Sequence, residues 1–206
     1  YQRISGENNA ELNVAISAMY RVLVVRSSGN NLISETQVAY APSPITYALA
    51  EVTACLDGMA IDLNQKDSEA LGGQSPLEFL VTYHASLEEA VNARNALSKE
   101  YIPSQTFQTI YVRTTSIENS SCFDVSESFD IIGMELPFLD FETSVFICGD
   151  APVVTIGQRI RDSNYSYDWS SGQTTSLITV AEEGVYTLSV TIMVGALQCI
   201  STRSVS

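Results

Sequence analysis

An internal repeat that links the two ends of the chain constrains the fold more than any other feature of the sequence. Residues 1–20 align without a gap on residues 167–186. Both stretches follow the pattern Tyr-x-[Trp/Arg]-x-x-Gly, then a short strand, then Tyr-x-[Val/Leu]-x-Val, and a one-residue slip later aligns Ile33-Ser34 with Ile200-Ser201. A repeat at such a long period indicates an array of related modules. Short apolar strands separated by turn residues are typical of a β-sandwich, so we expect a mainly β fold.

The position of the repeat also divides the chain. Residues 167–206 lie late in their module, so residues 1–41 correspond to only the second half of a module, and we expect its first half to lie upstream. The last four residues, Arg203-Ser204-Val205-Ser206, have a strand-like sequence as well. Both ends therefore predict that this chain is a fragment of a longer protein.

Two proline-containing segments punctuate the sequence between the repeated stretches. Ala41-Pro42-Ser43-Pro44 is typical of a stiff linker, because proline cannot donate a backbone hydrogen bond to a sheet. Gly133-Met134-Glu135-Leu136-Pro137 closes the segment that follows. We therefore expect three units: a half module at 1–41, a middle module at 43–132 and a last module at 134–206.

The middle module is expected to be rich in strands and to carry two short helices. The first helix follows Asn64 as its cap and stops at Gly72-Gly73. The second opens on the capping-box pattern Ser86-Leu87-Glu88-Glu89 and stops before Pro103, with Leu87, Ala90, Val91 and Leu97 on one side. Strands are predicted at 79–84, 109–114 and 123–132.

Composition limits the partners that the chain can have. The sequence carries 10 Lys and Arg against 24 Asp and Glu, a formal net charge of −14. Such a surface repels the phosphates of nucleic acid and anionic lipid head groups. No apolar run reaches the roughly 18 residues that a membrane helix needs. We expect neither nucleic acid nor direct membrane insertion.

Four widely spaced cysteines, Cys55, Cys122, Cys148 and Cys199, carry information about the compartment. They are even in number and include no Cys-x-x-Cys pair, which argues against a zinc site or a thioredoxin-like redox site. Four buried free thiols in a cytosolic protein would be the alternative reading. Two long-range disulfides in an oxidising compartment fit the spacing better.

Motifs within the middle segment resemble a recurring module of very large Bacteroidetes cell-surface proteins, those exported by type IX secretion, including gliding-motility adhesins. The resemblance rests on residues 61–67, 81–84 and 108–113. The flanking repeats are similar to the Ig-like or PKD-like domains that accompany this module. The resemblance implies tandem Ig-like β-sandwich modules around the β-rich module, an extracellular position at the cell surface, and cysteines at positions 55 and 122 of that module.

Four cysteines allow three connectivities. With the module boundaries above, we expect Cys55–Cys122 and Cys148–Cys199, since the other two connectivities would tie the middle module to the last one. Trp169 should then pack in the last core near Cys148–Cys199, with Tyr186 close to a strand corner. Trp169, Tyr186 and its repeat equivalent Tyr20 are the expected structural core residues. The first module departs from the pattern, because Arg3 stands in place of Trp169 and Leu32 in place of Cys199.

The sequence offers little for catalysis, and we expect no enzyme activity and no catalytic or cofactor-binding residue. His84 is the only histidine, so a Ser-His-Asp or Cys-His mechanism would have to use it. It alternates with Tyr83 on a predicted strand, which favours a surface or packed role over catalysis. No phosphate-binding glycine motif occurs.

One string resembles a calcium loop, with oxygen side chains alternating through residues 162–168. Tyr167 and Gln173 stand where such a loop needs its glycine and its bidentate glutamate. A strand explains the string better, with Tyr165, Tyr167 and Trp169 on one face. No metal ligand is predicted, although Ca²⁺ at a junction between modules stays open.

Three functions remain from the sequence. The first is a structural or adhesive segment of a large secreted filament, whose partners are neighbouring modules, surface polysaccharide or other surface proteins. The second is a carbohydrate-binding module, which would need a row of exposed aromatic rings. The third is a spacer of a cell-surface enzyme.

Overall fold

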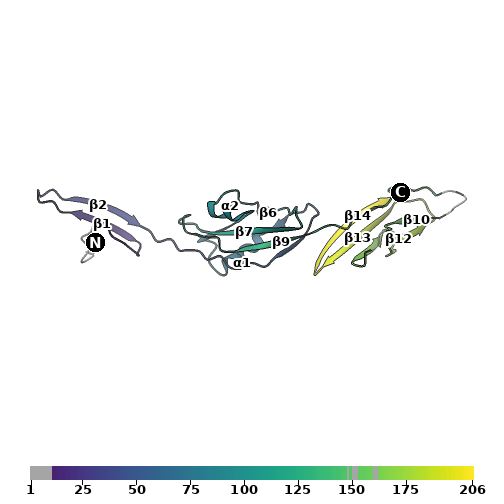
Figure 1. Ribbon diagram of the computed structural model, residues 1–206, viewed down its shortest axis with the longest axis horizontal. Helices are drawn as coiled ribbons and strands as arrows, with labels where there is room; N and C mark the ends of the chain where they lie inside the picture. Colours follow the sequence, from purple (N-terminus) through teal and green to yellow (C-terminus); the bar gives the residue numbers. More distant parts are fainter. Residues whose placement is uncertain (1–10, 148, 150–152, 160–161) are drawn as a thin grey trace.

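The computed structural model describes residues 11–147, 149, 153–159 and 162–206, and shows three bodies in a row (Figure 1). A hairpin lies at the N-terminal end, a mixed α/β body in the middle and a two-sheet body at the C-terminal end. The expectation of a mainly β chain with two short helices is confirmed. None of its helices is long and apolar enough to cross a membrane within the described residues.

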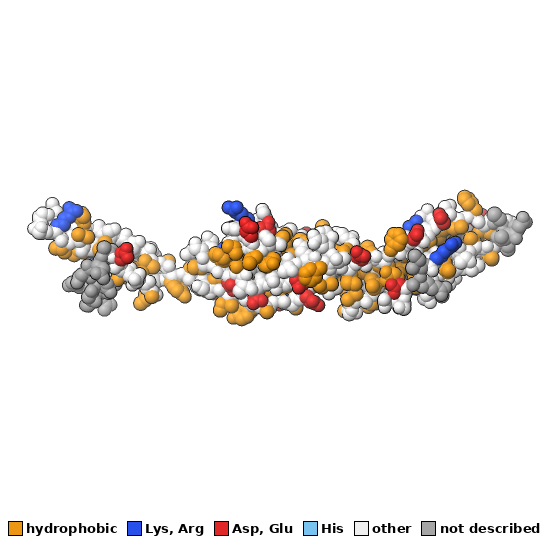
Figure 2. Space-filling model, in the orientation of Figure 1, with side chains coloured by type: hydrophobic (Ala, Val, Ile, Leu, Met, Phe, Trp, Pro, Cys, Tyr) orange, Lys and Arg blue, Asp and Glu red, His pale blue; other side chains and the backbone are white. Residues whose placement is uncertain are grey.

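The N-terminal hairpin consists of β1 (Ala18–Val24) and β2 (Leu32–Val38), which pair antiparallel. The turn between them lies at the end of the molecule, away from the middle module (Figure 1). Most of the hairpin's apolar side chains are exposed, and Figure 2 shows them as orange atoms over this part of the molecule. The hairpin therefore has strand pairing without a core of its own.

The middle module is built on one sheet with the strand order β3-β9-β7-β5, while β8 pairs with β7. A separate two-stranded ladder joins β4 and β6. Only β3 and β9 run parallel; the other pairs of the main sheet are antiparallel. A core around Leu63, Tyr83, Ile110 and Ile131 packs beneath it. The strands are β3 (Val52–Cys55), β4 (Ile61–Asp62), β5 (Phe79–His84), β6 (Glu100–Tyr101), β7 (Phe107–Ser116), β8 (Phe123–Asp124) and β9 (Ser128–Met134).

The two helices of the middle module differ from the sequence prediction, the first in the residue that caps it and the second in its length. A 3-10 turn, η1 (Leu63–Lys66), precedes α1 (Asp67–Leu71), and the capping side chain is Asp62 rather than Asn64. Ser86 caps α2 (Leu87–Asn92) as predicted, since its hydroxyl accepts the backbone N–H of Glu89. The helix nevertheless ends at Ala93, whose left-handed backbone (φ 51°) stops it well before Pro103.

The predicted strands of the middle module are present, with different bounds in two cases. The strand at 79–84 is confirmed as β5, and the strand at 109–114 is the centre of the longer β7. The predicted strand at 123–132 is split into β8 and β9. Asp124 accepts the backbone N–H of Ser126, a local turn that interrupts the extended backbone between them.

The last module is a two-sheet sandwich. One sheet pairs β10 (Val154–Gly157) with β12 (Leu177–Val180); the other has the order β11 (Tyr165–Trp169), β13 (Tyr186–Val194) and β14 (Leu197–Val205). Trp169 lies at the centre of the core between the sheets, 2% exposed, and its Nε1 donates to the carbonyl of Thr175 at 2.8 Å. Leu188, Val190 and Val205 join this core from β13 and β14 of the same sheet, and Ile156, Ile178 and Val180 from the opposing sheet.

The strand interpretation of residues 165–169 is confirmed, and it accounts for the calcium-like string. Along β11 the side chains of Tyr165, Tyr167 and Trp169 are half-buried or buried, while those of Ser166 and Asp168 are exposed. Asp162 accepts the backbone N–H of Asn164 at 2.9 Å, an ordinary turn before the strand. The described residues contain no group of three or more His, Cys, Asp or Glu arranged to hold a metal ion.

One structural device is shared by the two repeated stretches. The hydroxyl of Tyr186 donates to the carbonyl of Glu182, four residues earlier, at 3.1 Å. The hydroxyl of Tyr20 donates to the carbonyl of Ile16, also four residues earlier, at 2.8 Å. Such a tyrosine corner is a hallmark of immunoglobulin-type sandwiches, just before or at the start of the penultimate strand. The repeat in sequence is therefore a repeat in local structure.

Candidate functional site: the junction of the middle and last modules

A disulfide between Cys55 and Cys199 connects the middle module to the last one, with 5.5 Å between the Cα atoms. Cys55 is the last residue of β3 and is half-buried; Cys199 lies near the start of β14 and is 1% exposed. The Sγ atom of Cys55 also lies 3.5 Å from the carbonyl oxygen of Gln198. The two cysteines are 144 positions apart in sequence, and the bond between them crosses the boundary between the two modules.

The predicted pairings Cys55–Cys122 and Cys148–Cys199 are therefore wrong, and Cys122 carries a free thiol. Cys122 lies beside Ser116, at one end of β7, whereas Cys55 lies beyond Phe107, at the other end. Phe107 and Ser116 are nine strand positions apart, which corresponds to about 30 Å. A disulfide tolerates at most roughly 7 Å between Cα atoms, so Cys55 and Cys122 cannot meet. Cys148 lies outside the described residues.

The polypeptide makes a second connection next to the disulfide. β9 ends at Met134, whose carbonyl accepts the backbone N–H of Leu56 at 2.8 Å, so the chain leaves the middle module immediately beside Cys55. Gly133 is required for this close packing, because a Cβ there would lie 2.2 Å from the carbonyl oxygen of Gln105. The exit of the linker is thus fixed to the strand that carries the disulfide.

The last module holds the other end of the linker. The buried side chain of Gln158 accepts the backbone N–H of Asp140 at 2.8 Å and donates to the carbonyl of Phe138 at 3.3 Å. Arg203 donates to the carbonyl of Leu139 at 2.9 Å from β14, the strand that begins at the disulfide. Only residues 135–137 therefore remain between the two docked parts of the chain.

The disulfide and the linker thus cross the junction side by side as two separate covalent connections. Two separate attachments restrict both bending and rotation about a junction, whereas a single linker restricts neither. Inter-domain contacts of ordinary size leave relative motion as the default. This junction is constrained beyond that default by covalent bonds.

The junction between the hairpin and the middle module has a different construction. The chain docks on the middle module from residue 45 onward. Ile45 bonds the side chain of Gln74, and Thr46 donates its backbone N–H to Asp124 and its hydroxyl to Thr114. Burial acts to raise the pKa of Asp124, but the hydrogen bonds from Thr46 and Ser126 hold it below its ordinary value. No disulfide spans this junction within the described residues.

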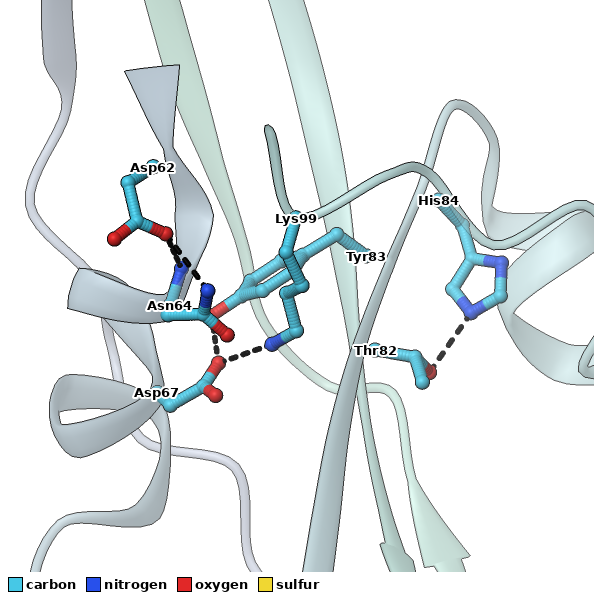
Figure 3. Close-up of polar contacts among 7 residues, drawn as sticks. All are labelled: Asp62, Asn64, Asp67, Thr82, Tyr83, His84 and Lys99. Atoms are coloured by element: carbon cyan, nitrogen blue, oxygen red, sulfur yellow. Dashed lines mark hydrogen bonds and ion pairs between the residues drawn. The ribbon is translucent and has the colours of Figure 1, made fainter. Parts of the chain in front are cut away.

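Polar side chains that pack against the core of the middle module form hydrogen-bonded networks (Figure 3). Asp67 accepts the hydroxyl of Tyr83 at 2.7 Å and the ammonium of Lys99 at 2.5 Å. Burial, followed by the bond to Asp67, raises the pKa of Tyr83. The Lys99 ammonium also lies 4.4 Å from the centre of the Tyr83 ring. The three groups satisfy one another and hold α1 against β5.

His84 occupies a second buried position, on the opposite side of β5 from Tyr83 (Figure 3). It is 1% exposed, with Nε2 3.0 Å from the hydroxyl of Thr82 and Nδ1 2.8 Å from the carbonyl of Arg94. Arg113 lies buried at the end of α2, where it donates to the carbonyls of Ala90 and Val91. These contacts fasten the loop and helix to the sheet, and of the two roles expected for His84, at the surface or packed, the structure has the packed one.

The sequence contained a signal for the true disulfide, but the repeat alignment obscured it. In the last module Gly195-Ala196 forms a tight turn, and β13 and β14 pair up to Val194–Leu197. In the N-terminal hairpin the pairing stops at Val24–Leu32, with a seven-residue connection. Tyr186 faces Val205, whereas Tyr20 faces Thr36, so Leu32 does not occupy the position of Cys199. The longer hairpin is what carries Cys199 to the middle module.

No significant relative of this chain is found among curated proteins. Residues 51–137 match a protein family described as the Flavobacterium inter-domain disulphide bond domain. The matched segment begins just before β3 and ends in the linker, so it contains Cys55 and leaves its partner, Cys199, in the next module. This similarity and the Cys55–Cys199 bond both indicate an extracellular, oxidising setting.

Proposed function

We propose that this chain is a structural segment of a large secreted cell-surface filament or adhesin, in which the middle and last modules act as one stiff unit. The observation that carries the proposal is the Cys55–Cys199 bond beside the docked linker. A rod made from small modules needs stiff junctions to keep its length. Here the junction between the middle and last modules has a disulfide beside the linker, whereas the junction between the hairpin and the middle module is crossed by a single chain.

The arrangement of the modules supports this role. The three bodies lie in a row, the chain crosses from each to the next once, and the termini of the described chain lie toward opposite ends (Figure 1). On the face shown in Figure 2, the acidic side chains are spread along the molecule rather than gathered at one place. Both features suit an extended, solvated spacer that contacts its neighbours end to end.

The finer assignments follow from the sequence resemblance. We place the parent protein among gliding-motility-type adhesins exported by type IX secretion, at the cell surface, with neighbouring modules, surface polysaccharide or other surface proteins as partners. We also propose that the segment has no catalytic role. In support, the ring of His84 is buried and bonded at both nitrogens, so it is not available as a general base.

The carbohydrate-binding alternative loses its strongest candidate residue. Sugar rings stack on exposed aromatic faces, and Trp169 lies in the core at 2% exposure. A spacer of a cell-surface enzyme would use the same stiff junction, so the structural role is common to both remaining interpretations.

Backbone relaxation in NMR tests the proposal, because it gives the tumbling of each module separately. In the oxidised 206-residue chain we expect the middle and last modules to share one correlation time. In Cys55→Ser they should tumble more independently, while Cys122→Ser, which removes the free thiol, should behave like the parent chain. Independent tumbling of the two modules in the oxidised parent would refute the proposed stiff unit.

A further inference from the structure

Each of the two disulfide-bonded strands lies at the edge of a sheet. β3 is the terminal strand in the order β3-β9-β7-β5, and β14 is the terminal strand in the order β11-β13-β14. Cys55 is the last residue of β3, and Cys199 lies close to the first residue of β14. The bond therefore joins the end of one edge strand to the beginning of another.

The two strands also point the same way along the molecule. β3 runs parallel to β9, which leads into the linker and the last module. β14 runs from the junction toward the C-terminal end of the last module (Figure 1). A path from β3 through the sulfur atoms into β14 thus keeps the N-to-C direction and omits everything between Cys55 and Cys199.

The first part of this path has almost no slack. Thr46 is anchored to Thr114 near one end of β7, and Cys55 lies two positions beyond the Ile132–Phe107 pair at the other end. Seven strand positions from Thr114 to Phe107 and two more to Cys55 amount to about 30 Å. The nine residues from Thr46 to Cys55 can span at most about 32 Å. They already run nearly straight across the module.

The second part of the path is also extended. Cys199–Val205 is continuous β-strand, paired residue by residue with β13. A strand rises about 3.3 Å per residue, close to the limit of a stretched chain. Ser206 then pairs with the segment at Thr143 and Val145, at the far end of the module. Because this segment is already extended, a force on the end of β14 reaches the disulfide after only a small lengthening of the strand.

We propose that tension along the molecule passes through β3, the Cys55–Cys199 bond and β14, and bypasses residues 56–198. This inference rests on the proposed structural function and gives it a mechanism. Force on the two ends of the chain stretches the residues outside the disulfide loop. Apart from Val205, the buried residues of the two hydrophobic cores, around Tyr83 and Trp169, lie inside the loop and are not pulled apart.

The size of the protected segment sets the expected effect. Cys55 and Cys199 are 144 positions apart, so the chain between them would add about 500 Å of contour length if it were released. With the bond intact, none of that length is available to a stretching force. Only residues before Cys55 and after Cys199 can extend.

Single-molecule force spectroscopy on the full 206-residue chain, with handles at its two ends, measures this length directly. The oxidised chain should show no extension from residues 56–198. Cys55→Ser, or the parent chain in reductant, should release about 500 Å in addition. Cys122→Ser is the matched control and should stay as short as the oxidised parent. Any release from inside the loop in the oxidised parent overturns the inference.

The outcomes separate this inference from the proposed function. A parent chain whose modules tumble together but which still releases the long segment would keep the stiff unit and refute the bypass. A parent chain whose modules tumble independently but which resists extension would do the reverse. Release of the full length by both Cys55→Ser and the oxidised parent would refute the bypass regardless of tumbling.

Discussion

The N-terminal hairpin and the β13–β14 hairpin have the same local design but opposite environments. Both carry a tyrosine hydroxyl bonded four residues back, at Tyr20 and Tyr186. Yet Val22 and Val24 are 55% and 48% exposed, whereas their repeat equivalents Leu188 and Val190 are 0% exposed. Strand pairing and corner geometry thus arise from local sequence, while burial requires an opposing sheet. β10 and β12 supply that cover in the last module, while β11 pairs with β13 in the same sheet.

This difference also assigns a meaning to the exposed apolar residues of the first hairpin. Their alternation along β1 is the pattern of a sandwich core, since positions 20, 22 and 24 share one face. The expectation that residues 1–41 are the second half of a module stays a prediction. The following experiments alter the comparison, starting with the largest expected effect.

Removing the disulfide should lower the free energy of unfolding the most. It tests the comparison because only the β13–β14 hairpin, and not the N-terminal one, extends far enough to carry a bridging cysteine. The chain-entropy relation for a loop of 144 positions gives about 5 kcal/mol for Cys199→Ser. Denaturant unfolding of the oxidised protein measures the loss. Cys122→Ser should change the free energy of unfolding far less, because that thiol is unbonded. Equal losses for the two variants would contradict the observed connectivity.

Emptying the core of the last module should come next. Trp169→Ala is expected to lower the free energy of unfolding by about 3–5 kcal/mol, because it leaves a large cavity between the sheets. Trp169→Phe keeps most of the volume and loses the hydrogen bond to Thr175, so it should cost less. Trp fluorescence is lost in both variants, so circular dichroism should follow the unfolding. A cost below 1 kcal/mol for Trp169→Ala would mean that the indole does not support the core.

The paired core positions test the comparison most directly. Leu188→Ala should cost about 2–5 kcal/mol, the usual range for a buried leucine. Val22→Ala, at the equivalent position of the N-terminal hairpin, should stay within about 0.5 kcal/mol, as exposed positions usually do. Thermal and denaturant unfolding of the two variants gives the difference. A large cost at Val22 would show that something covers the hairpin in solution.

These contrasts also mark what the sequence could predict. Alternation and capping patterns located β5, the cap of α2 and the inward face of β11, because they depend on neighbours within a few residues. The length of α2 was overestimated, because a left-handed Ala93 is not visible in the apolar spacing. Local patterns therefore predicted which helices and strands form, but not where all of them end.

The functional site depends on long-range geometry, which explains why its pairing was wrong. The choice of Cys55–Cys122 assumed that modules fold and crosslink separately. The positions of Cys55 and Cys122 at opposite ends of the sheet follow from the order β3-β9-β7-β5, which no local pattern encodes. A turn of two residues at Gly195-Ala196, instead of seven in the first hairpin, was the available signal, since it lengthens the arm that carries Cys199.

The smallest effect should distinguish the two tyrosine corners. Tyr186→Phe removes one hydrogen bond, from the hydroxyl to the carbonyl of Glu182, while keeping the ring in place. A hydrogen bond contributes about 0.5–1.5 kcal/mol net, and less where water can replace it, so a loss near the lower figure is expected.

Tyr20→Phe removes the same bond from the hairpin that has no covered core. Because that hairpin is not packed against the modules that unfold cooperatively, its loss should leave the main unfolding transition unchanged. The local effect should instead appear as faster amide hydrogen exchange along β1 and β2. A shift of the main transition by Tyr20→Phe as large as that by Tyr186→Phe would mean that the hairpin is coupled to the rest of the chain across residues 41–44, and the two junctions would then differ less than their bonding implies.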